Sequence, residues 1–356
     1  MHIPDGYLSP QSCGALGAAM VPAWTMAGRR VRKVVKSRYV PLVAIGAAYS
    51  FLVMMFNVPI PDGTTAHAVG GVLIAVVLGP WAAVIAVSIA LLIQALFFGD
   101  GGVLAYGANA FNMALVMPLV GYGVYRALSR NVSLTSPRRP LAAGLGAYIG
   151  LNTAALCAAV EFGVQPSLFH SPNGTPLYAP FHLSQTIPTM ALAHLTVAGM
   201  VELALTAGAI AYLQRANLPL LRINHGTVPD IEADACPPKR IGWRWALAGL
   251  GTMVAFAPLG LIAPGRAFGE DAPGKLDLAK YHVNTVPNGL RHYAGFWHNA
   301  LFNGYGFSHD RHPTVAYLVS ALVGIAVIAA MLFMAVGVMR LVRRGRRADV
   351  LAGRAS

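Results

Sequence analysis

The sequence predicts an all-α, polytopic membrane protein with about nine transmembrane helices. The first observation is the composition: 56% of the 356 residues are hydrophobic and 11% are charged, whereas soluble domains carry about 25% charged residues. The second is that the few charges leave long uncharged stretches, each long enough for the roughly 20 apolar residues that a spanning helix needs. The mean hydropathy of +0.57 agrees with both.

The uncharged stretches give the predicted spans in chain order. The stretch from Gly63 to Gly99 is long enough for two helices, because Gly79 and Pro80 in its middle form a natural helix break. The seventh span is interrupted by a single carboxylate, that of Glu202. The nine predicted spans are Gly6–Gly28, Tyr39–Pro61, two within Gly63–Gly99, Gly101–Tyr125, Pro140–Val160, about Gln185–Tyr212, Trp245–Pro264 and Pro313–Met339.

The positions of lysine and arginine predict the orientation. If the amino terminus lies outside, 21 of the 26 basic residues fall in four inner segments, which are Arg29–Arg38, Arg126–Arg139, Arg215–Arg244 and Arg340–Arg354. Basic residues concentrate on the cytoplasmic side of membrane proteins, so we expect an outer amino terminus and a cytoplasmic carboxyl terminus. The net charge of +13 then reflects topology and contact with anionic membrane lipid rather than a nucleic-acid surface.

The chain divides into two predicted modules. Residues 1–214 hold seven spans, and residues 215–240 form a proline-containing polar segment that we interpret as a cytoplasmic linker. Residues 241–356 hold the last two spans, separated by an outer loop over residues 265–312. No GxxxxGK[ST] phosphate-binding motif occurs in this sequence, so we expect it not to bind ATP through a P-loop.

The amino terminus carries the strongest chemical signal. A Met-His start offers three nitrogens in one plane: the α-amine of Met1, the deprotonated backbone amide nitrogen of His2 and the imidazole Nδ1 of His2. A fourth planar nitrogen would complete a tetragonal set that suits Ni(II), Cu(II) and low-spin Co(II) better than Zn(II) or Mg(II). The alternative is a start methionine that merely precedes a histidine.

Topology alone brings a fourth nitrogen donor to the same side of the membrane. With the amino terminus outside, His67 lies at the outer start of the third predicted helix. The glycine-rich loop at Asp100–Gly102 and the polar helix start at Gly107–Asn109 lie on that side as well. Ionisable groups at the mouth of a membrane helix are functional candidates, although a lone histidine there also fits an ordinary interfacial residue.

Three segments of this first module, MHIPDGYLSP, PIPDGTTAHAVGGVL and FFGDGGVLAYGANAFNM, strongly resemble the CbiM/NikM family. Its members are substrate-capturing membrane components of energy-coupling-factor transporters for cobalt and nickel. The resemblance implies that Met1, His2 and His67 hold the transported Ni²⁺ or Co²⁺ in a planar four-nitrogen site. It also implies separate ATPase subunits, a membrane coupling subunit and a place in the bacterial inner membrane. The second module resembles the accessory component CbiN/NikN, to which Ala267–Asp271 (AFGED) is weakly similar.

The resemblance describes a transport subunit rather than an enzyme, with the metal as cargo and no resident cofactor. Nickel and cobalt both remain open, cobalt uptake serving cobalamin biosynthesis. A stand-alone secondary transporter would favour charges near broken helices in mid-membrane, and only Glu202 qualifies. A membrane metalloenzyme would need an open coordination site and a general base, for which this sequence shows no motif such as HExxH.

Other polar residues keep more than one interpretation. Glu202 fits a hydrogen bond to another helix, contact with the coupling subunit, or movement of protons or metal. The histidines near the seventh span, His170, His182 and His194, fit satisfied structural residues better than ligands. The outer loop of the second module carries five histidines, which fit either a polar loop or weak metal collection; they are His282, His292, His298, His309 and His312.

Overall fold

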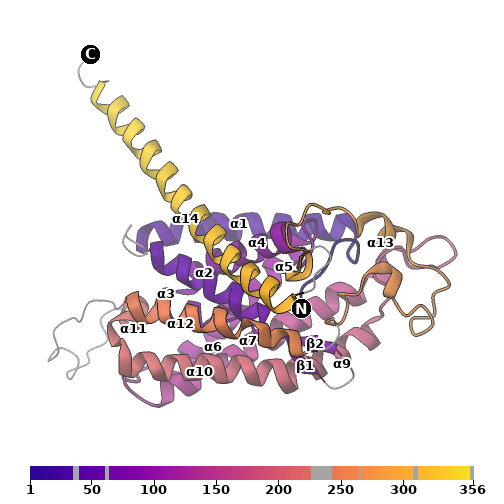
Figure 1. Ribbon diagram of the computed structural model, residues 1–356, viewed down its shortest axis with the longest axis horizontal. Coiled ribbons are helices and arrows are strands. Elements are labelled where there is room, and N and C mark those ends of the chain that lie inside the picture. Colours follow the sequence, from indigo (N-terminus) through magenta and orange to yellow (C-terminus); the bar gives the residue numbers. More distant parts are fainter. Residues whose placement is uncertain (35–39, 61–63, 226–242, 264–265, 308–311, 353–356) are drawn as a thin grey trace.

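The computed structural model describes residues 1–34, 40–60, 64–225, 243–263, 266–307 and 312–352. Within these ranges almost all regular structure is helical, which confirms the predicted all-α fold (Figure 1). The exception is one short antiparallel hairpin of β1 (Val58–Ile60) and β2 (Thr64–Ala66). The core of the helix bundle is apolar and rich in alanine and glycine.

The first predicted module contributes ten helices to the part of the chain described. They are α1 (Pro10–Val34), α2 (Val40–Met55), α3 (Gly71–Leu78), α4 (Pro80–Ile93), α5 (Tyr106–Asn109), α6 (Met117–Leu128), α7 (Arg138–Gly163), α8 (Gln165–Leu168), α9 (Leu183–Ala193) and α10 (Gly199–Ala216). Three π-helical turns make some of these continuous: η2 (Gln94–Phe98) extends α4, η3 (Ala110–Val116) joins α5 to α6, and η4 (His194–Ala198) joins α9 to α10. Such turns are rare in proteins as a whole, but those that occur are often found at functional sites.

The remaining described chain holds α11 (Leu218–His225), α12 (Trp243–Phe256), η5 (Ala257–Ile262), η6 (Pro273–Lys275), α13 (Asn288–Tyr293), η7 (Asn303–Tyr305) and α14 (Pro313–Ala352). The start of the predicted linker at 215–240 is helical, as the end of α10 and α11, and residues 226–242 lie outside the described part. Helix α14 packs against α2 and α4 and then extends well beyond the bundle (Figure 1).

Four helical segments of the described chain are long and apolar enough to cross a membrane: Pro80–Phe98, Arg138–Leu168, Leu183–Ala216 and Pro313–Ala335. Two shorter apolar helices cover Val40–Met55 and Ala246–Ile262. Every one of the nine predicted spans contains helix, but nine full crossings and their orientation remain predictions. The predicted break is confirmed, because α3 ends at Leu78, α4 begins at Pro80, and Gly79 between them has a φ of 95°.

The third predicted span is much shorter than the sequence indicated. Helix α3 has eight residues, about 12 Å at 1.5 Å per residue, far less than the roughly 30 Å of a bilayer core. Residues 64–66 pair with β1 instead, and Gly70 takes a left-handed φ of 73° against the ring of Tyr49. His67 therefore lies in a loop before α3 and not at its first turn.

Glycines allow α6 and α7 to approach backbone to backbone. A Cβ added at Gly121 of α6 would lie 2.7 Å from the carbonyl oxygen of Gly146 in α7. One added at Gly150 of α7 would lie 2.6 Å from the carbonyl oxygen of Met117. Close approach through small residues is a common way for membrane helices to associate.

We predict that Gly121→Ala lowers the free energy of unfolding by about 1–3 kcal/mol, the usual cost of overpacking a filled contact. Gly123→Ala is the matched control, because Gly123 lies in the same helix, is exposed, and has open space where a Cβ would stand. The measurement is the thermal unfolding midpoint of each variant purified in detergent. Equal midpoints for the two variants would contradict the close approach.

Candidate metal centre

The first residues of the chain are buried, although chain termini are usually mobile and solvated. Met1 and His2 are each 2% exposed and Ile3 is fully buried. The segment enters the bundle among the outer loops, and α1 begins only at Pro10, where the Ser12 backbone N–H donates to the Ser9 hydroxyl as an N-cap. The amino terminus is therefore part of the core.

Asn109 fixes the backbone of this segment. The Ile3 N–H donates to Asn109 Oδ1 at 2.8 Å, and Asn109 Nδ2 donates to the Ile3 carbonyl at 3.0 Å. The Gly102 N–H donates to the same carbonyl at 2.8 Å. A side-chain amide thus pairs with a backbone as a neighbouring strand would. The glycine-rich loop and the polar helix start that the sequence placed beside the terminus do contact it.

Asp5 ties the segment to the same loop. Its carboxylate accepts the backbone N–H groups of Val103, Leu104 and Ala105 at 3.1, 2.8 and 3.1 Å. Burial raises the pKa of Asp5, while the three N–H bonds oppose that rise by favouring the charged form. Gly102 leaves room for this contact, because a Cβ there would stand 2.5 Å from the Asp5 backbone nitrogen.

Two imidazoles face each other at the inner end of the segment. His67 Nε2 lies 3.2 Å from His2 Nδ1, and the ring centroids are 4.8 Å apart. Both residues are buried, at 3% and 2% exposure. Metal–imidazole bonds of about 2.0–2.1 Å at a right angle would separate two nitrogens by about 2.9 Å. The observed separation of the two nitrogens is therefore close to the one that binding a common metal ion requires.

Hydrogen bonding leaves Nε2 of His67 unprotonated, so its lone pair is free to bind a metal. The other ring nitrogen, Nδ1, lies 3.0 Å from the Ala68 carbonyl oxygen, which can only accept, so Nδ1 carries the proton. Such a bond fixes the ring and its tautomer. The pKa of His67 lies well below its usual value, mainly because of burial and then because of the charges of the α-amine, His2 and His194. His67 is thus neutral, the form that ligates metals.

The α-amine of Met1 pairs with a carboxylate from the other end of the sequence. Its nitrogen lies 3.2 Å from Glu270 Oε1, with the amine buried and the Glu270 side chain 20% exposed. Glu270 belongs to the predicted outer loop at 265–312. Sequence reasoning did not single out Glu270, and the only signal for it was the AFGED similarity.

Asp100 contacts the other candidate ligand of the terminus. Its Oδ1 lies 3.3 Å from His2 Nδ1, and Tyr305 of the outer loop donates its hydroxyl to Asp100 Oδ2 at 2.5 Å. Gln94 in η2 donates to the Tyr305 oxygen at 2.9 Å. The glycine-rich loop was expected at this site, but a role for its carboxylate was not. Two of the predicted ligand nitrogens therefore face carboxylates.

Glu202 is a hydrogen-bond acceptor for the backbone. Its fully buried carboxylate accepts the backbone N–H of Val69 at 2.7 Å and that of Gly70 at 3.1 Å. The partner is the loop that follows His67, not the neighbouring helix that one interpretation favoured. Glu202 therefore fixes the backbone on which His67 stands, from a distance of 132 residues in sequence.

The other histidines of the described chain do not join this site as ligands. His194 donates its Nδ1–H to the Met190 carbonyl within its own helix, at 2.8 Å. In the residues described, no group of three or more His, Cys, Asp or Glu side chains is arranged to hold a metal. The outer-loop histidines His282, His292, His298 and His312 thus form no such cluster, and His309 lies outside the described residues.

Comparison with known families decides the identity. Residues 2–220 match the CbiM family, described as the cobalt uptake substrate-specific transmembrane region. The chain belongs to the CbiM family. The resemblance predicted from the three sequence segments is confirmed.

Relatives of this CbiM-family chain include proteins that span both modules. The fused nickel transport protein NikMN of Rhodobacter capsulatus is 46% identical over 97% of this chain and 99% of its own length. The probable fused nickel transport protein LarMN of Lactiplantibacillus plantarum is 44% identical over 92% and 95%. The second module is therefore a fused NikN-like part, and these relatives are named as transport proteins, not enzymes.

Solved structures resemble part of this chain. The crystal structure of a truncated transition metal transporter is 56% identical and covers 60% of this chain and 98% of its own, with a TM-score of 0.56. A second transition metal transporter gives 56% identity, 60% and 93% coverage, and a TM-score of 0.57.

We predict that Glu202→Ala destabilises this region, because the Val69 and Gly70 N–H groups then lack their acceptor inside the bundle. An unsatisfied buried donor costs about 1–3 kcal/mol, so the loss is about 2–6 kcal/mol in unfolding free energy. Glu202→Gln keeps one carbonyl oxygen and is expected to lose less. Thermal midpoints in detergent compare the two, and equal midpoints for Ala and wild type would refute the assignment.

Proposed function

We propose that this chain is the metal-capturing membrane component of an ATP-driven energy-coupling-factor importer, with nickel as its cargo. The observation that carries the proposal is the buried pair of His2 Nδ1 and His67 Nε2, 3.2 Å apart beside a buried chain terminus. The names of the relatives support transport of a transition metal, and the proposal extends that statement to the binding site, the partners and the cell membrane.

The proposed ligands are four nitrogens from three residues. The α-amine of Met1, the backbone nitrogen of His2 and His2 Nδ1 belong to consecutive chelate rings, and His67 Nε2 would complete the plane. Binding requires the amine, the amide and the imidazoles to lose or lack protons, so metal uptake releases protons. The amine pairs with Glu270, and His2 Nδ1 faces Asp100. The ion must replace both contacts.

The donor set favours nickel among the metals left open. Planar nitrogen ligation is typical of Ni(II) and Cu(II), and Ni(II) binds more tightly than Co(II) in the Irving–Williams order. The two relatives that cover nearly the whole chain are both named nickel transport proteins. Relatives named cobalt transport protein CbiM match 36% to 46% of this chain at 36–37% identity.

The proposed complex contains partners that supply energy. Separate ATPase subunits would act through a membrane coupling subunit, and the chain would lie in the bacterial inner membrane with its metal site outside. Support for this orientation comes from the inner placement of 21 of 26 basic residues. With this orientation, we expect the loop anchored by Glu202 and the docked terminus to lie on the opposite side of the membrane from these charges.

We predict that His67→Ala abolishes high-affinity Ni²⁺ binding while the protein still inserts and folds, because three nitrogens from the terminus leave one planar position open. His170→Ala is the matched control, since His170 is exposed and its ring contacts only a neighbouring carbonyl. Equilibrium binding to the purified proteins measures the effect. Unchanged affinity in His67→Ala would remove His67 from the site.

A second prediction depends on the chain end and not on a side chain. A long amino-terminal tag turns the α-amine into an amide and cannot fit where Met1 is buried and its amine lies 3.2 Å from Glu270. We expect it to eliminate metal uptake in cells that also express the ATPase and coupling subunits. The tag must be long, because one added residue places histidine third, where the new terminus forms a four-nitrogen set of its own.

The control for the tag is the same sequence fused after Ser356, on the predicted cytoplasmic side, which should leave uptake intact. Normal uptake by the amino-terminally tagged protein, with the tag shown by mass spectrometry to be uncleaved, would contradict the site.

A further inference from the structure

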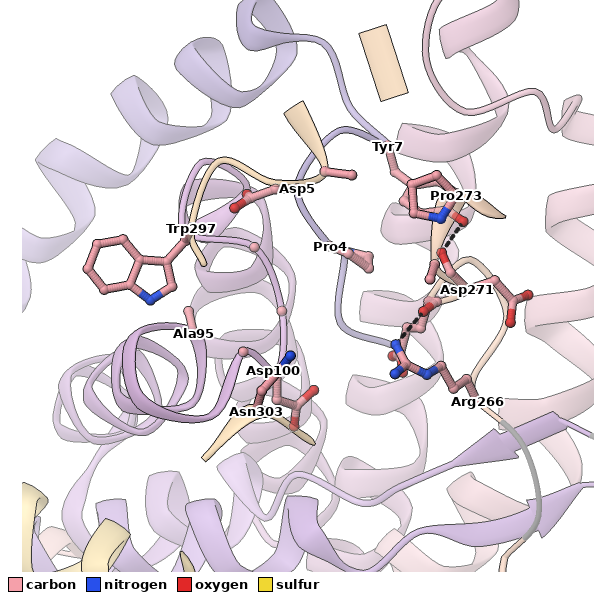
Figure 2. A pocket seen from close by; sticks show the side chains of 16 residues that line it. Pro4, Asp5, Tyr7, Ala95, Asp100, Arg266, Asp271, Pro273, Trp297 and Asn303 are labelled. Carbon is pink, nitrogen blue, oxygen red and sulfur yellow. Dashed lines mark hydrogen bonds between the residues drawn. The ribbon is translucent and has the colours of Figure 1, made fainter. Parts of the chain in front are cut away.

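A polar cavity of about 290 Å³ lies beside the docked terminus, between the two modules. The first module supplies the terminal segment at Pro4–Tyr7 and the loop at Gly99–Gly102. The second supplies Arg266, the stretch Glu270–Pro273 and the aromatic ring of Trp297. Figure 2 shows Asp100 and Arg266 projecting toward this space from opposite modules.

The charge of the lining indicates a cation. Four of the chain's thirteen carboxylates line the cavity, Asp5, Asp100, Glu270 and Asp271, against one basic residue, Arg266. The chain as a whole carries a net charge of +13, so this concentration runs against the general composition. Clefts lined by one sign of charge raise the local concentration of the opposite ion.

The cavity is large enough for a hydrated metal ion. A water molecule occupies about 30 Å³ in the liquid, so an ion with six waters needs roughly 200 Å³. Oxygen ligands also suit an ion that still holds its water shell better than the nitrogen set does, because carboxylate and water are the harder donors. The cavity can hold such an ion before dehydration, whereas the space between His2 and His67 cannot.

Two of the lining carboxylates already touch the predicted ligand nitrogens. Glu270 Oε1 is 3.2 Å from the α-amine and Asp100 Oδ1 is 3.3 Å from His2 Nδ1. Directly behind the wall, His2 is buried, and its Nε2 has no hydrogen-bond partner among the described residues. The ring carbon bonded to that nitrogen, Cδ2, lies 3.3 Å from where a Cβ would stand on Gly101, which lines the cavity.

We propose that this cavity is a receiving site for the hydrated divalent cation, bound by the carboxylates of Asp100 and Glu270 before it passes to the nitrogens. The proposal rests on the function proposed above. Each carboxylate contacts a nitrogen that would take its place as a ligand: Glu270 contacts the Met1 amine, and Asp100 contacts His2 Nδ1. The ion therefore exchanges oxygen for nitrogen ligands over a few ångströms. The fused second module supplies Glu270, half of the carboxylate pair.

The kinetic test measures association of Ni²⁺ by stopped flow for the full-length protein and its Asp100→Asn, Glu270→Gln double variant. We expect the association rate constant to fall at least about tenfold, as expected when electrostatic steering is lost, and its dependence on ionic strength to flatten. Asp277→Asn is the control, because Asp277 is an exposed carboxylate of the same loop outside the cavity. Unchanged association in the double variant would overturn the proposal.

A second measurement keeps the two proposals separable. Mn²⁺ prefers oxygen donors, so in the His67→Ala background we expect saturable Mn²⁺ binding by electron paramagnetic resonance that the added Asp100→Asn, Glu270→Gln pair removes. Absence of Mn²⁺ binding in His67→Ala overturns the receiving site. Retained high-affinity Ni²⁺ binding in His67→Ala contradicts the nitrogen site instead. Complete loss of equilibrium Ni²⁺ binding in the double variant overturns the relay by placing the carboxylates in the final site.

Discussion

The pairing of Asn109 with the backbone of Ile3 is the interaction on which the rest of this site depends. Ordering one backbone residue costs about 1–2 kcal/mol, and a free chain end has no neighbour on one side to share that cost. Asn109 and Gly102 together make three hydrogen bonds to Ile3, and Asp5 accepts three more. These bonds place His2 opposite His67 with both rings buried. A ligand set that begins at residue 1 needs hydrogen bonds of this kind to hold the terminal segment in place.

The second module also contacts the terminal segment and the loop that holds it. Tyr305 donates to Asp100 and stacks on Phe98, with ring centroids 5.1 Å apart. Tyr7 of the terminal segment donates its hydroxyl to the Asp271 carbonyl at 2.7 Å. Gly6, with a φ of 90°, brings the segment so close to α13 that an added Cβ would lie 2.6 Å from the Leu290 carbonyl oxygen. The fused part therefore packs against the terminal segment and contacts the proposed ligand Met1.

Hydropathy and helix-breaking residues predicted the fold because both determine the structure of the segment in which they occur. The apolar stretches became helices, and Gly79-Pro80 divided two of them where expected. The short α3 was not predictable, because the pairing of residues 58–60 with residues 64–66 and the left-handed Gly70 depend on packing against Tyr49 and on the acceptor Glu202. Those contacts join residues that are distant in sequence and leave no periodic pattern.

The candidate site shows the same division. The meeting of Met1, His2 and His67 on one side followed from topology and from the chelating geometry of a Met-His terminus. The carboxylates that face those nitrogens did not, because Glu270 reaches Met1 across 269 residues from a loop without regular periodicity. Asp100 lay in a segment already singled out, but only its contact with His2 gives the carboxylate a role.

The central claim is a planar four-nitrogen centre formed by the chain terminus and His67. X-ray absorption on the purified, Ni²⁺-loaded protein, with magnetic susceptibility on the same sample, tests it most directly. Planar ligation predicts four nitrogen donors at one short distance and a diamagnetic low-spin ion, since tetragonal nitrogen sites are typical of Ni(II). A paramagnetic, six-coordinate ion held mainly by oxygen would contradict the account.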